Sequence, residues 1–264
     1  MYTNISPHPP VSFCWIPRNV GHLVAPMLFP QLLLRRISIT AAALILTLSL
    51  APCTKATAFI YPASYNVTTI IPAPPQLGSQ EYKIDTGYLK NARASSNKEQ
   101  ITKAIAASHD SVFDYSEALG SWFNSDNLPK TTALFNRVDA ETKQAIEIAK
   151  HYFVRTRPLY WLETGDPEKS NGYSYPSGHT TRAFVWAILL SNAFPDQTKA
   201  LHSEARQKAW YRVILGRHFP ADVRAGKIYG KFLAGEFLKS PEFQKQWPVV
   251  VVELQAARKT LHRS

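Results

Sequence analysis

The segment from Tyr211 to Asp222 places a guanidinium, an imidazole and a carboxylate at fixed spacings. Arg212 precedes His218 by six residues, and Asp222 follows His218 by four. Because proline suits the first turn of a helix, a helix that begins at Pro220 would bring Asp222 within reach of the His218 ring. A carboxylate on one ring nitrogen fixes the tautomer and leaves a lone pair on the other nitrogen. Such an imidazole can serve as a nucleophile or as a metal ligand.

Two upstream blocks carry groups that suit the same kind of chemistry. The first holds Lys150 and Arg157, which is followed by Pro158, and the second is Pro-Ser-Gly-His at residues 176–179. Lysine and arginine supply positive charge to a phosphoryl dianion, and arginine can bind two of its oxygens at once. A helix that starts at the second block would add free backbone N–H groups for an anion.

The three blocks together predict one site that holds and cleaves a phosphate monoester. The cations would bind phosphate oxygens, the serine would add a hydroxyl, and the glycine would let the backbone come close. One imidazole can attack phosphorus while the other protonates the leaving oxygen. The predicted site residues are Lys150, Arg157, Ser177, Gly178, His179, Arg212, His218 and Asp222.

Other charged residues near these blocks lie off the fixed spacings. His151 and Arg155 fall inside the first block, and we interpret them as helix surface or as the rim of a pocket. Arg217, next to His218, is interpreted as a solvated side chain. These three residues are therefore left out of the predicted site.

The elements expected to position the blocks are helices, because few stretches of the chain alternate with period two. Asp139 is expected to cap a helix that ends at or before Arg157, since Pro158 disfavours helix in the residue before it. The second block is expected to open a strongly apolar helix. The predicted fold class is all-α.

The chain is long enough for one domain with its own core. It has 264 residues, of which 45% are hydrophobic and 19% are charged. We expect a single helical-bundle domain over residues 80–264, preceded by an extended arm over residues 59–79 that is rich in proline and β-branched residues. Within the domain, Ser96 and Glu99 form a predicted capping box that opens a helix.

The N-terminal region has the features of a secretory signal. Residues 37–50 form an uncharged apolar run after the two arginines at 35–36, and Ala-Thr-Ala at 56–58 follows as a cleavage site of the A-x-A type. The run is too short to span a bilayer comfortably, although a retained anchor stays open. We therefore expect a signal region at 1–58, cleavage after Ala58 and a periplasmic or secreted protein.

The start of the leader and the redox state follow from the same region. Met27 would start a more ordinary leader than Met1, because the first 26 residues are proline-rich and lack acidic side chains. The arginine pair leaves the twin-arginine export route open beside the general one. Both cysteines, Cys14 and Cys53, precede the predicted cleavage, so the mature chain would contain no disulfide.

The formal net charge of the whole chain is +11 at pH 7. Such a charge suits a nucleic acid, an anionic surface or small anionic substrates. The chain has no Lys/Arg run of the kind found in basic tails, so charge alone does not choose among these partners.

The three blocks resemble the signature of the type 2 phosphatidic acid phosphatase superfamily, and specifically its soluble branch, the bacterial class A non-specific acid phosphatases. That signature is Lys-x6-Arg-Pro, then Pro-Ser-Gly-His, then Ser-Arg-x5-His-x3-Asp. The resemblance covers about residues 75–245 and departs at Tyr211, where the family usually has serine. A tyrosine there would change any contact that the serine hydroxyl makes and could narrow the pocket.

The resemblance implies a role for each residue of the predicted site. His218 would be the nucleophile that forms a phosphohistidine, and Asp222 would orient it. His179 would give a proton to the departing alcohol and then activate water. The other five site residues would bind the phosphate oxygens, and the reaction would need no metal or other cofactor. The family's fold is a helical bundle shared with the vanadium haloperoxidases.

Three other functions use the same side chains. A vanadium-dependent haloperoxidase would hold vanadate in the same cradle, a lipid phosphatase would act on membrane substrates, and a polyanion-binding module would use the charge without chemistry. We expect instead an exported, metal-independent acid phosphatase of broad range that acts on small phosphomonoesters, and transfer of phosphate to other alcohols is open. We expect no nucleic-acid partner and no stable membrane span after cleavage, and a homo-oligomer stays open.

Overall fold

The computed structural model of the chain describes residues 57–158 and 172–261. All of them belong to the unit Thr54–Ser264, and the fold is given for that unit alone. The predicted signal region lies outside the described residues except for positions 57 and 58.

The described part of the chain is helical and contains no strand. Its elements, with η for a 3-10 helix, are η1 (Pro62–Ser64), α1 (Val67–Ile70), α2 (Gln80–Ser95), α3 (Lys98–Ala106), η2 (Val112–Tyr115), α4 (Ser116–Leu119), α5 (Pro129–Phe153), α7 (Gly178–Ala193), η3 (Pro195–Gln197), α8 (Thr198–Ile214), α9 (Pro220–Lys239) and α10 (Pro241–Leu261). The all-α prediction is confirmed.

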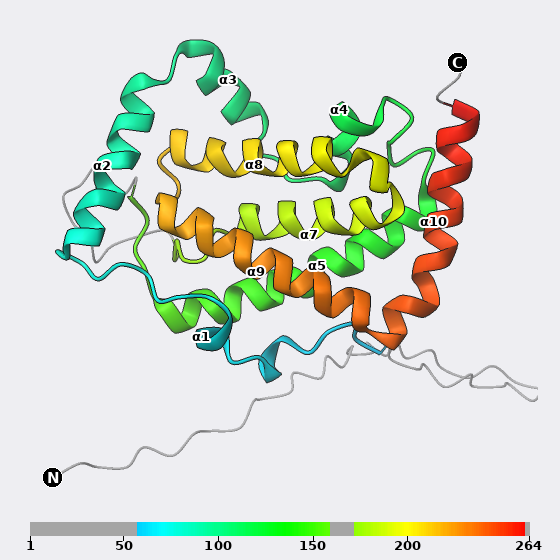
Figure 1. Cartoon of the computed structure of the whole chain (residues 1–264), viewed down its shortest axis with the longest axis horizontal. Helices are drawn as coiled ribbons and strands as arrows, with labels where there is room; N and C mark the ends of the chain where they lie inside the picture. Colours follow the sequence, from blue (N-terminus) through cyan, green and yellow to red (C-terminus); the bar gives the residue numbers. More distant parts are fainter. Residues whose placement is uncertain (1–56, 159–171, 262–264) are drawn as a thin grey trace, which may run out of the picture. The chain divides into compact units, whose positions relative to one another are not determined.

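Helix α7 forms the centre of the bundle. It packs against α8, α9 and α5, and Figure 1 shows it between α8 and α9. Phe184, Val185, Trp186 and Leu189 on this helix are all buried. A helix that is apolar on most of its surface is stable only when other elements cover it. The apolar sequence that follows the second block therefore makes α7 the core helix.

Two glycines of α9 allow this helix to lie directly on the backbone of α7. A β-carbon at Gly226 would come within 2.7 Å of the Ser177 carbonyl oxygen. A β-carbon at Gly230 would come within 2.5 Å of the Thr181 carbonyl oxygen. Real β-carbons do not approach an oxygen this closely, so only glycine fits at both positions. The contact fixes the first turns of α7 and α9 against each other.

The segment at 59–79 does more than cover the surface. It contains η1 and α1, and Phe59 is buried with its ring 5.5 Å from that of Phe243. The Glu141 carboxylate accepts hydrogen bonds from the backbone N–H groups of Phe59 and Ile60. This segment is therefore an integral part of the helical core.

Two predicted helix starts differ from the structure. The capping box that opens α3 is formed by Asn97 and Gln100, one residue later than the predicted pair of Ser96 and Glu99. An asparagine accepts from the third helical N–H as well as serine does, so the two registers compete closely. Asp139 does not cap a helix, because α5 starts ten residues earlier, at Pro129.

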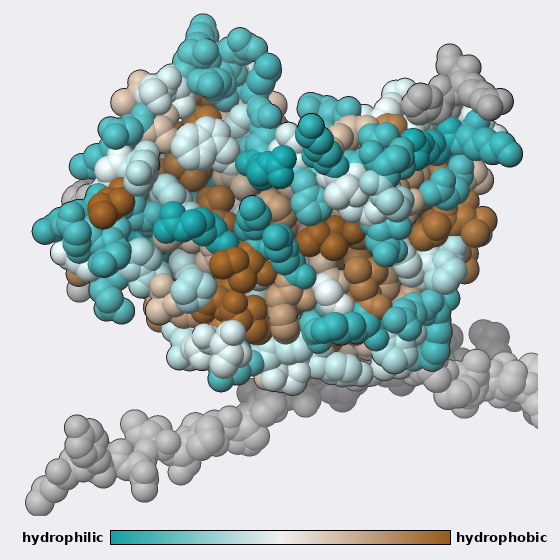
Figure 2. All heavy atoms as spheres, viewed as in Figure 1, coloured by the Kyte–Doolittle hydropathy of each residue, from teal (hydrophilic) through white to brown (hydrophobic). Residues whose placement is uncertain are grey.

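None of the helices in the described ranges has the length and apolar character that a membrane crossing requires. On the face shown in Figure 2, hydrophilic residues cover α3, and apolar residues gather around α9.

Candidate active site

The third block lies in the turn between α8 and α9. The Arg212 carbonyl oxygen accepts hydrogen bonds from the backbone N–H groups of Arg217, at 3.0 Å, and of His218, at 3.2 Å. Gly216 permits this tight turn with a φ of 66°, a conformation that favours glycine. Helix α9 starts at Pro220, as predicted. The turn thus brings Arg212 and His218 together at the start of α9.

The side chain of His218, which precedes α9, faces that of Asp222 in the first turn of α9, and both are buried. His218 Nδ1 lies 3.5 Å from Asp222 Oδ2. The same Oδ2 atom accepts a hydrogen bond of 2.8 Å from the backbone N–H of Phe219, which fixes the carboxylate. A carboxylate beside Nδ1 favours the proton there and leaves the lone pair on Nε2. The predicted pairing of His218 with Asp222 is therefore present.

The lone-pair nitrogen of His218 faces the guanidinium of Arg157. Arg157 Nη1 lies 3.3 Å from His218 Nε2 and 3.2 Å from the Arg217 carbonyl oxygen, to which it donates. The first and third blocks therefore meet in space, although about sixty residues separate them. An oxyanion held by Arg157 would lie directly in front of the His218 ring.

Arg212 supplies a second, more deeply buried cation. Its side chain is only 6% exposed, and its Nη1 atom donates to the Ser108 hydroxyl at 3.4 Å. Its Nε atom has no hydrogen-bond partner within the described residues. Burial lowers the pKa of the Arg212 guanidinium to about 10, with Arg217 and Arg157 acting in the same direction. The group stays charged at acidic and neutral pH and has a donor left for a ligand.

The second block joins the third through the backbone. Ser177 N–H donates to the Asp222 carbonyl oxygen at 3.0 Å. Ser177 is the N-cap of α7, and its hydroxyl oxygen accepts from the Thr180 hydroxyl at 2.9 Å. The prediction that this block opens a helix is confirmed. The free N–H groups at the start of α7 therefore lie beside the turn that carries His218.

Lys150 completes the positive charge from the other side. A β-carbon at Gly178 would lie 3.9 Å from Lys150 Nζ, so the ammonium group lies at the N-terminus of α7. Lys150 also forms an ion pair of 3.3 Å with Glu147, one turn earlier on α5. Burial lowers the pKa of the Lys150 ammonium, and the repulsion of Arg157 adds to this effect. Lys150, Arg157 and Arg212 therefore place three positive charges near the N-terminus of α7.

The second histidine, His179, lies in the first turn of α7. Its Nε2 atom is 3.3 Å from the Ser108 carbonyl oxygen and 3.3 Å from Asp110 Oδ2. Burial lowers the pKa of the His179 imidazole to about 3, and the positive charge of Arg212 acts in the same direction. The ring is therefore neutral in the ligand-free site. An anion in the site would offset this repulsion and favour the protonated ring.

Sequence reasoning missed the segment that carries Ser108 and Asp110. Both residues lie between α3 and η2, about seventy residues before His179, and no spacing in the sequence links them to the blocks. Asp110 also forms an ion pair of 2.8 Å with Arg182, whose guanidinium bonds to Asp139. Asp139 therefore joins two helices instead of capping one.

The interpretation of Arg155 as helix surface or pocket rim is wrong. Its side chain is buried, and it donates to Asp222 Oδ1 at 2.7 Å and to Asp85 Oδ2 at 2.9 Å. Helix α5 ends at Phe153, and Val154 has a left-handed φ of 51° that turns the chain inward. The misreading followed from extending the helix as far as Arg157, which would place Arg155 on its outer face.

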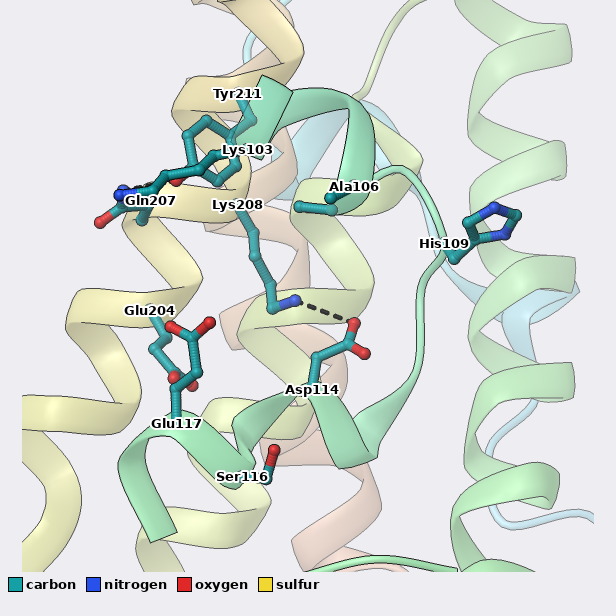
Figure 3. Close-up of a pocket in the computed structure, with 11 residues that line it drawn as sticks. Lys103, Ala106, His109, Asp114, Ser116, Glu117, Glu204, Gln207, Lys208 and Tyr211 are labelled. Atoms are coloured by element: carbon teal, nitrogen blue, oxygen red, sulfur yellow. Dashed lines mark hydrogen bonds and ion pairs between the residues drawn. The ribbon is translucent and has the colours of Figure 1, made fainter. Parts of the chain in front are cut away.

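The tyrosine that replaces the usual serine points elsewhere. The Tyr211 hydroxyl accepts a hydrogen bond of 2.7 Å from Gln207 Nε2, one turn earlier on α8. Figure 3 shows Tyr211 beside Gln207 and Lys103 at a cavity of about 640 Å³ between α3, α4 and α8. None of the eight predicted site residues lines this cavity. The Tyr211 hydroxyl is therefore bonded within α8, and the effect of this tyrosine on the phosphate pocket stays a prediction.

The helical bundle brings the three cations and the two histidines of the predicted blocks together. The family model of the PAP2 superfamily matches residues 142–245, a range that contains all eight predicted site residues. The chain is also similar to curated relatives named non-specific acid phosphatase.

The relative from Salmonella typhimurium is 31% identical over 202 residues, which cover 72% of this chain and 81% of that protein. The relative from Providencia stuartii is 29% identical over 188 residues, which cover 67% of this chain and 76% of that protein. The chain belongs to the non-specific acid phosphatases of the PAP2 superfamily, and it is a phosphatase.

The chain is also similar, over a shorter range, to a protein with a different name. An undecaprenyl-diphosphatase from Sulfolobus acidocaldarius is 32% identical over 114 residues, which cover 40% of this chain and 52% of that protein.

Proposed function

We propose that the protein hydrolyses phosphate monoesters through a covalent intermediate on His218 Nε2. The observation that carries this proposal is the position of Nε2, 3.3 Å from Arg157 Nη1, with Asp222 on the opposite side of the ring. A nucleophile must face the phosphorus atom while cations hold the oxygens of the phosphoryl group. Burial lowers the pKa of the His218 imidazole to about 4, which keeps Nε2 unprotonated over most of the pH range.

In the first half of the reaction the phosphoryl group passes to the enzyme. The lone pair of His218 Nε2 forms a bond to phosphorus, and the bond from phosphorus to the ester oxygen breaks. His179 takes the proton that the ester monoanion brings and gives it to that oxygen, so the product leaves as a neutral alcohol. The negative charge on the phosphoryl oxygens faces Arg157, Arg212 and Lys150.

In the second half water replaces the alcohol. His179 is now neutral and takes a proton from the water as its oxygen attacks phosphorus. The bond between phosphorus and Nε2 breaks, and its electron pair returns to His218. His179 passes this proton to the departing phosphate, and both rings regain their starting states. An alcohol in place of water would yield a new phosphate ester by the same steps.

The proposed reaction uses no metal ion. Lys150, Arg157 and Arg212 and the free N–H groups of α7 supply the positive charge that a metal would otherwise provide. We expect EDTA to leave the rate unchanged. Phosphate and vanadate, which carry the same tetrahedral set of oxygens, should inhibit competitively. A bromide-oxidising activity with added vanadate and peroxide would instead indicate the haloperoxidase alternative.

Broad specificity and export belong to the same proposal. The residues of the site grip the phosphoryl group, and the relatives' name, non-specific acid phosphatase, agrees with a loosely held leaving group. Export is supported by the arginine pair and apolar run at 35–50 and the Ala-Thr-Ala sequence that follows. Separation of periplasm from cytoplasm after expression of the full chain, with activity measured in each fraction, tests this part.

A second candidate function is hydrolysis of lipid phosphates. It is favoured by the similarity to the protein named undecaprenyl-diphosphatase, which covers 52% of that protein. The two candidates are separated by measuring kcat/KM for p-nitrophenyl phosphate and for undecaprenyl diphosphate in detergent. A preference for the lipid of tenfold or more would favour the second candidate.

The decisive test of the mechanism is trapping of the intermediate. The full chain is mixed with a phosphate ester labelled with radioactive phosphorus and quenched in alkali within milliseconds, because phosphohistidine is stable in base and labile in acid. We expect label on the wild type and on His202→Gln, a control histidine of α8. His218→Ala should carry no label. Label that persists in His218→Ala would overturn the assignment.

A further inference from the structure

We propose that Arg155 is a positioning residue for the reaction, which acts through Asp222 and is itself held in place by Asp85. This inference rests on the proposed function, because it concerns the nucleophile that the proposed mechanism assigns to His218. Arg155 does not contact the phosphoryl group in this assignment. It sets the charge and the orientation of the carboxylate that holds the ring.

The side chains form a continuous buried chain of four groups. Arg155 Nη1 donates to Asp222 Oδ1 at 2.7 Å, and Asp222 Oδ2 lies 3.5 Å from His218 Nδ1. On the other side, Arg155 Nη2 donates to Asp85 Oδ2 at 2.9 Å. All four side chains are at most 6% exposed. Charged groups at this depth are stable only when they are paired, and Arg155 is paired with both Asp85 and Asp222.

Asp85 also connects the four groups to α9, the helix that carries Asp222. Its second oxygen, Oδ1, accepts a hydrogen bond of 2.8 Å from the backbone N–H of Ala221, in the first turn of α9. The guanidinium of Arg155 also lies 4.0 Å over the ring of Phe219. Asp85 is contributed by α2, outside residues 142–245 that match the family model. The site therefore extends to a helix that the motif blocks do not include.

The shape of arginine matters for this role. A guanidinium is a planar fork that can donate to two carboxylates at once, whereas a lysine ammonium is a single point of charge. Arg155 uses one nitrogen for each carboxylate, so the Asp222 carboxylate is held in one plane. Lysine at this position would keep the charge and lose the fork. The two contributions, charge and orientation, are therefore separable by mutation.

The charge of Arg155 has a defined effect on ionisation. Burial would raise the pKa of the Asp222 carboxyl, but Arg155 and His218 hold it below the usual range. Without the guanidinium, Asp222 would be harder to ionise, and an ionised Asp222 would bind the His218 proton more strongly. Both effects make His218 nucleophilic only at higher pH. Loss of the Arg155 charge therefore moves the acidic limb of the kcat/KM profile, the pH range in which activity rises from zero, to higher pH.

Other charges around these groups are unchanged by the proposed substitutions. The cations that face Asp222 and His218 are Arg155, Arg157, Arg212 and Lys150. The remaining titratable groups near them are Asp85, His179, Tyr82 and Tyr175, and burial raises the pKa of both tyrosines. The tyrosines therefore stay neutral across the acidic range, and Asp85 is the group whose charge opposes that of Arg155.

The test compares pH profiles of kcat/KM for three variants of the full chain, each corrected for active fraction by the burst of product. Arg155→Gln should lower kcat by about 10- to 100-fold, the range for partners of groups that act directly. Its KM should change little, and its acidic limb should move to higher pH. Arg155→Lys should restore the position of the acidic limb and leave kcat low. Asp85→Asn should move the limb to lower pH, because it removes the opposing charge.

The matched control is Tyr229→Phe, which removes a buried hydrogen bond of 3.2 Å to the Ala145 carbonyl oxygen and leaves the four groups intact. If Arg155 had only a structural role, its variants would contain less active enzyme, as we expect for this control. The shape of their pH profiles would then be unchanged. That result, or an acidic limb that moves the same way in Arg155→Gln and Asp85→Asn, would overturn the inference. If Arg155→Gln does not fold, the directions in Arg155→Lys and Asp85→Asn still decide.

Failure of the proposed function has a different signature. In that case the wild type itself would show no label in the trapping experiment, and its acidic limb would not follow a buried imidazole. A labelled wild type with unchanged profiles in all three variants would reject the role of Arg155 alone.

Discussion

The backbone N–H of Ser177 donates a hydrogen bond of 3.0 Å to the carbonyl oxygen of Asp222. This bond joins the start of α7 to the first turn of α9, so the N-terminus of α7 and Asp222 cannot move independently. The glycines of α9 make this possible, because they let the two backbones approach. The geometry of the site therefore depends on packing as well as on its charged residues.

The packing of the two helices gives a prediction for Gly226→Ala. Its β-carbon would lie 2.7 Å from the Ser177 carbonyl oxygen and 3.0 Å from Thr180 Cβ. Overpacking of this kind costs about 1–3 kcal/mol of unfolding free energy, and here it would also displace the start of α7. We expect a lower melting temperature together with a lower kcat/KM.

The control for this prediction lies on the same helix. A β-carbon at Gly235 meets no atom within 4 Å. Gly235→Ala should therefore stabilise the protein by about 0.5–1 kcal/mol, because glycine weakens a helix interior, and it should leave kcat/KM unchanged. Equal thermal stability of the two variants in denaturation experiments would contradict the close contact at Gly226.

The pH dependence of kcat/KM follows from the two imidazoles. This quantity reports the free enzyme and the free substrate. His218 must be neutral to attack, and its pKa of about 4 places the acidic limb there, well below the 6.5 of an exposed imidazole. His179 is neutral in the empty site, so the proton for the leaving group arrives with the monoanion of the ester, whose second pKa is about 6.

We therefore expect a bell-shaped profile with its maximum between about pH 4 and pH 6, measured by initial rates across constant-ionic-strength buffers. An acidic limb near 6.5 would show that the His218 ring is solvated and would contradict its burial.

The buried guanidinium of Arg212 should contribute strongly to catalysis. Its Nε atom has no partner within the described residues. In the proposed mechanism its charge faces the growing charge on the phosphoryl oxygens. Removal of one preorganised donor of this kind costs about 10²–10³ in kcat. We expect Arg212→Ala to show such a loss in steady-state assays, whereas Arg258→Ala, which breaks the surface ion pair with Asp196, should be near wild type. Similar losses in both variants would argue against a special role for Arg212.

The substitution of tyrosine for the family's serine should be nearly silent. The Tyr211 hydroxyl bonds to Gln207 beside a separate cavity (Figure 3). Tyr211→Phe and Tyr211→Ser should change kcat/KM for p-nitrophenyl phosphate by at most about twofold, or ~0.4 kcal/mol in the barrier. A change of tenfold in either variant would place this side chain in the path of the substrate.

The sequence predicted those parts of the site that lie at fixed spacings within one element. Asp222 lies in the first turn of α9, four residues after His218 in the preceding turn, and Ser177 caps the helix that follows it, so local rules suffice. The structure brings all three blocks together, as expected. Their catalytic and binding roles are predictions that the experiments above address.

The parts that sequence reasoning missed depend on contacts across the fold. Asp85 reaches the site from a helix far upstream, and Asp110 reaches His179 from a connector. Periodicity describes which face of a helix is buried, but it does not say which distant carboxylate will meet a given cation. Arg155 was misplaced for a more local reason, because the end of α5 lies a few residues earlier than Pro158 alone suggests.

The Glu141 carboxylate holds the backbone nitrogens of Phe59 and Ile60 at 2.9–3.1 Å. If a peptidase cuts after Ala58, the nitrogen of Phe59 becomes a terminal ammonium in the same place. The Glu141 carboxylate would then form a partly buried ion pair with this ammonium group. Cleavage would therefore strengthen the attachment of the new N-terminus to α5. The folded domain thus already holds a carboxylate at the position where cleavage would create the new N-terminus.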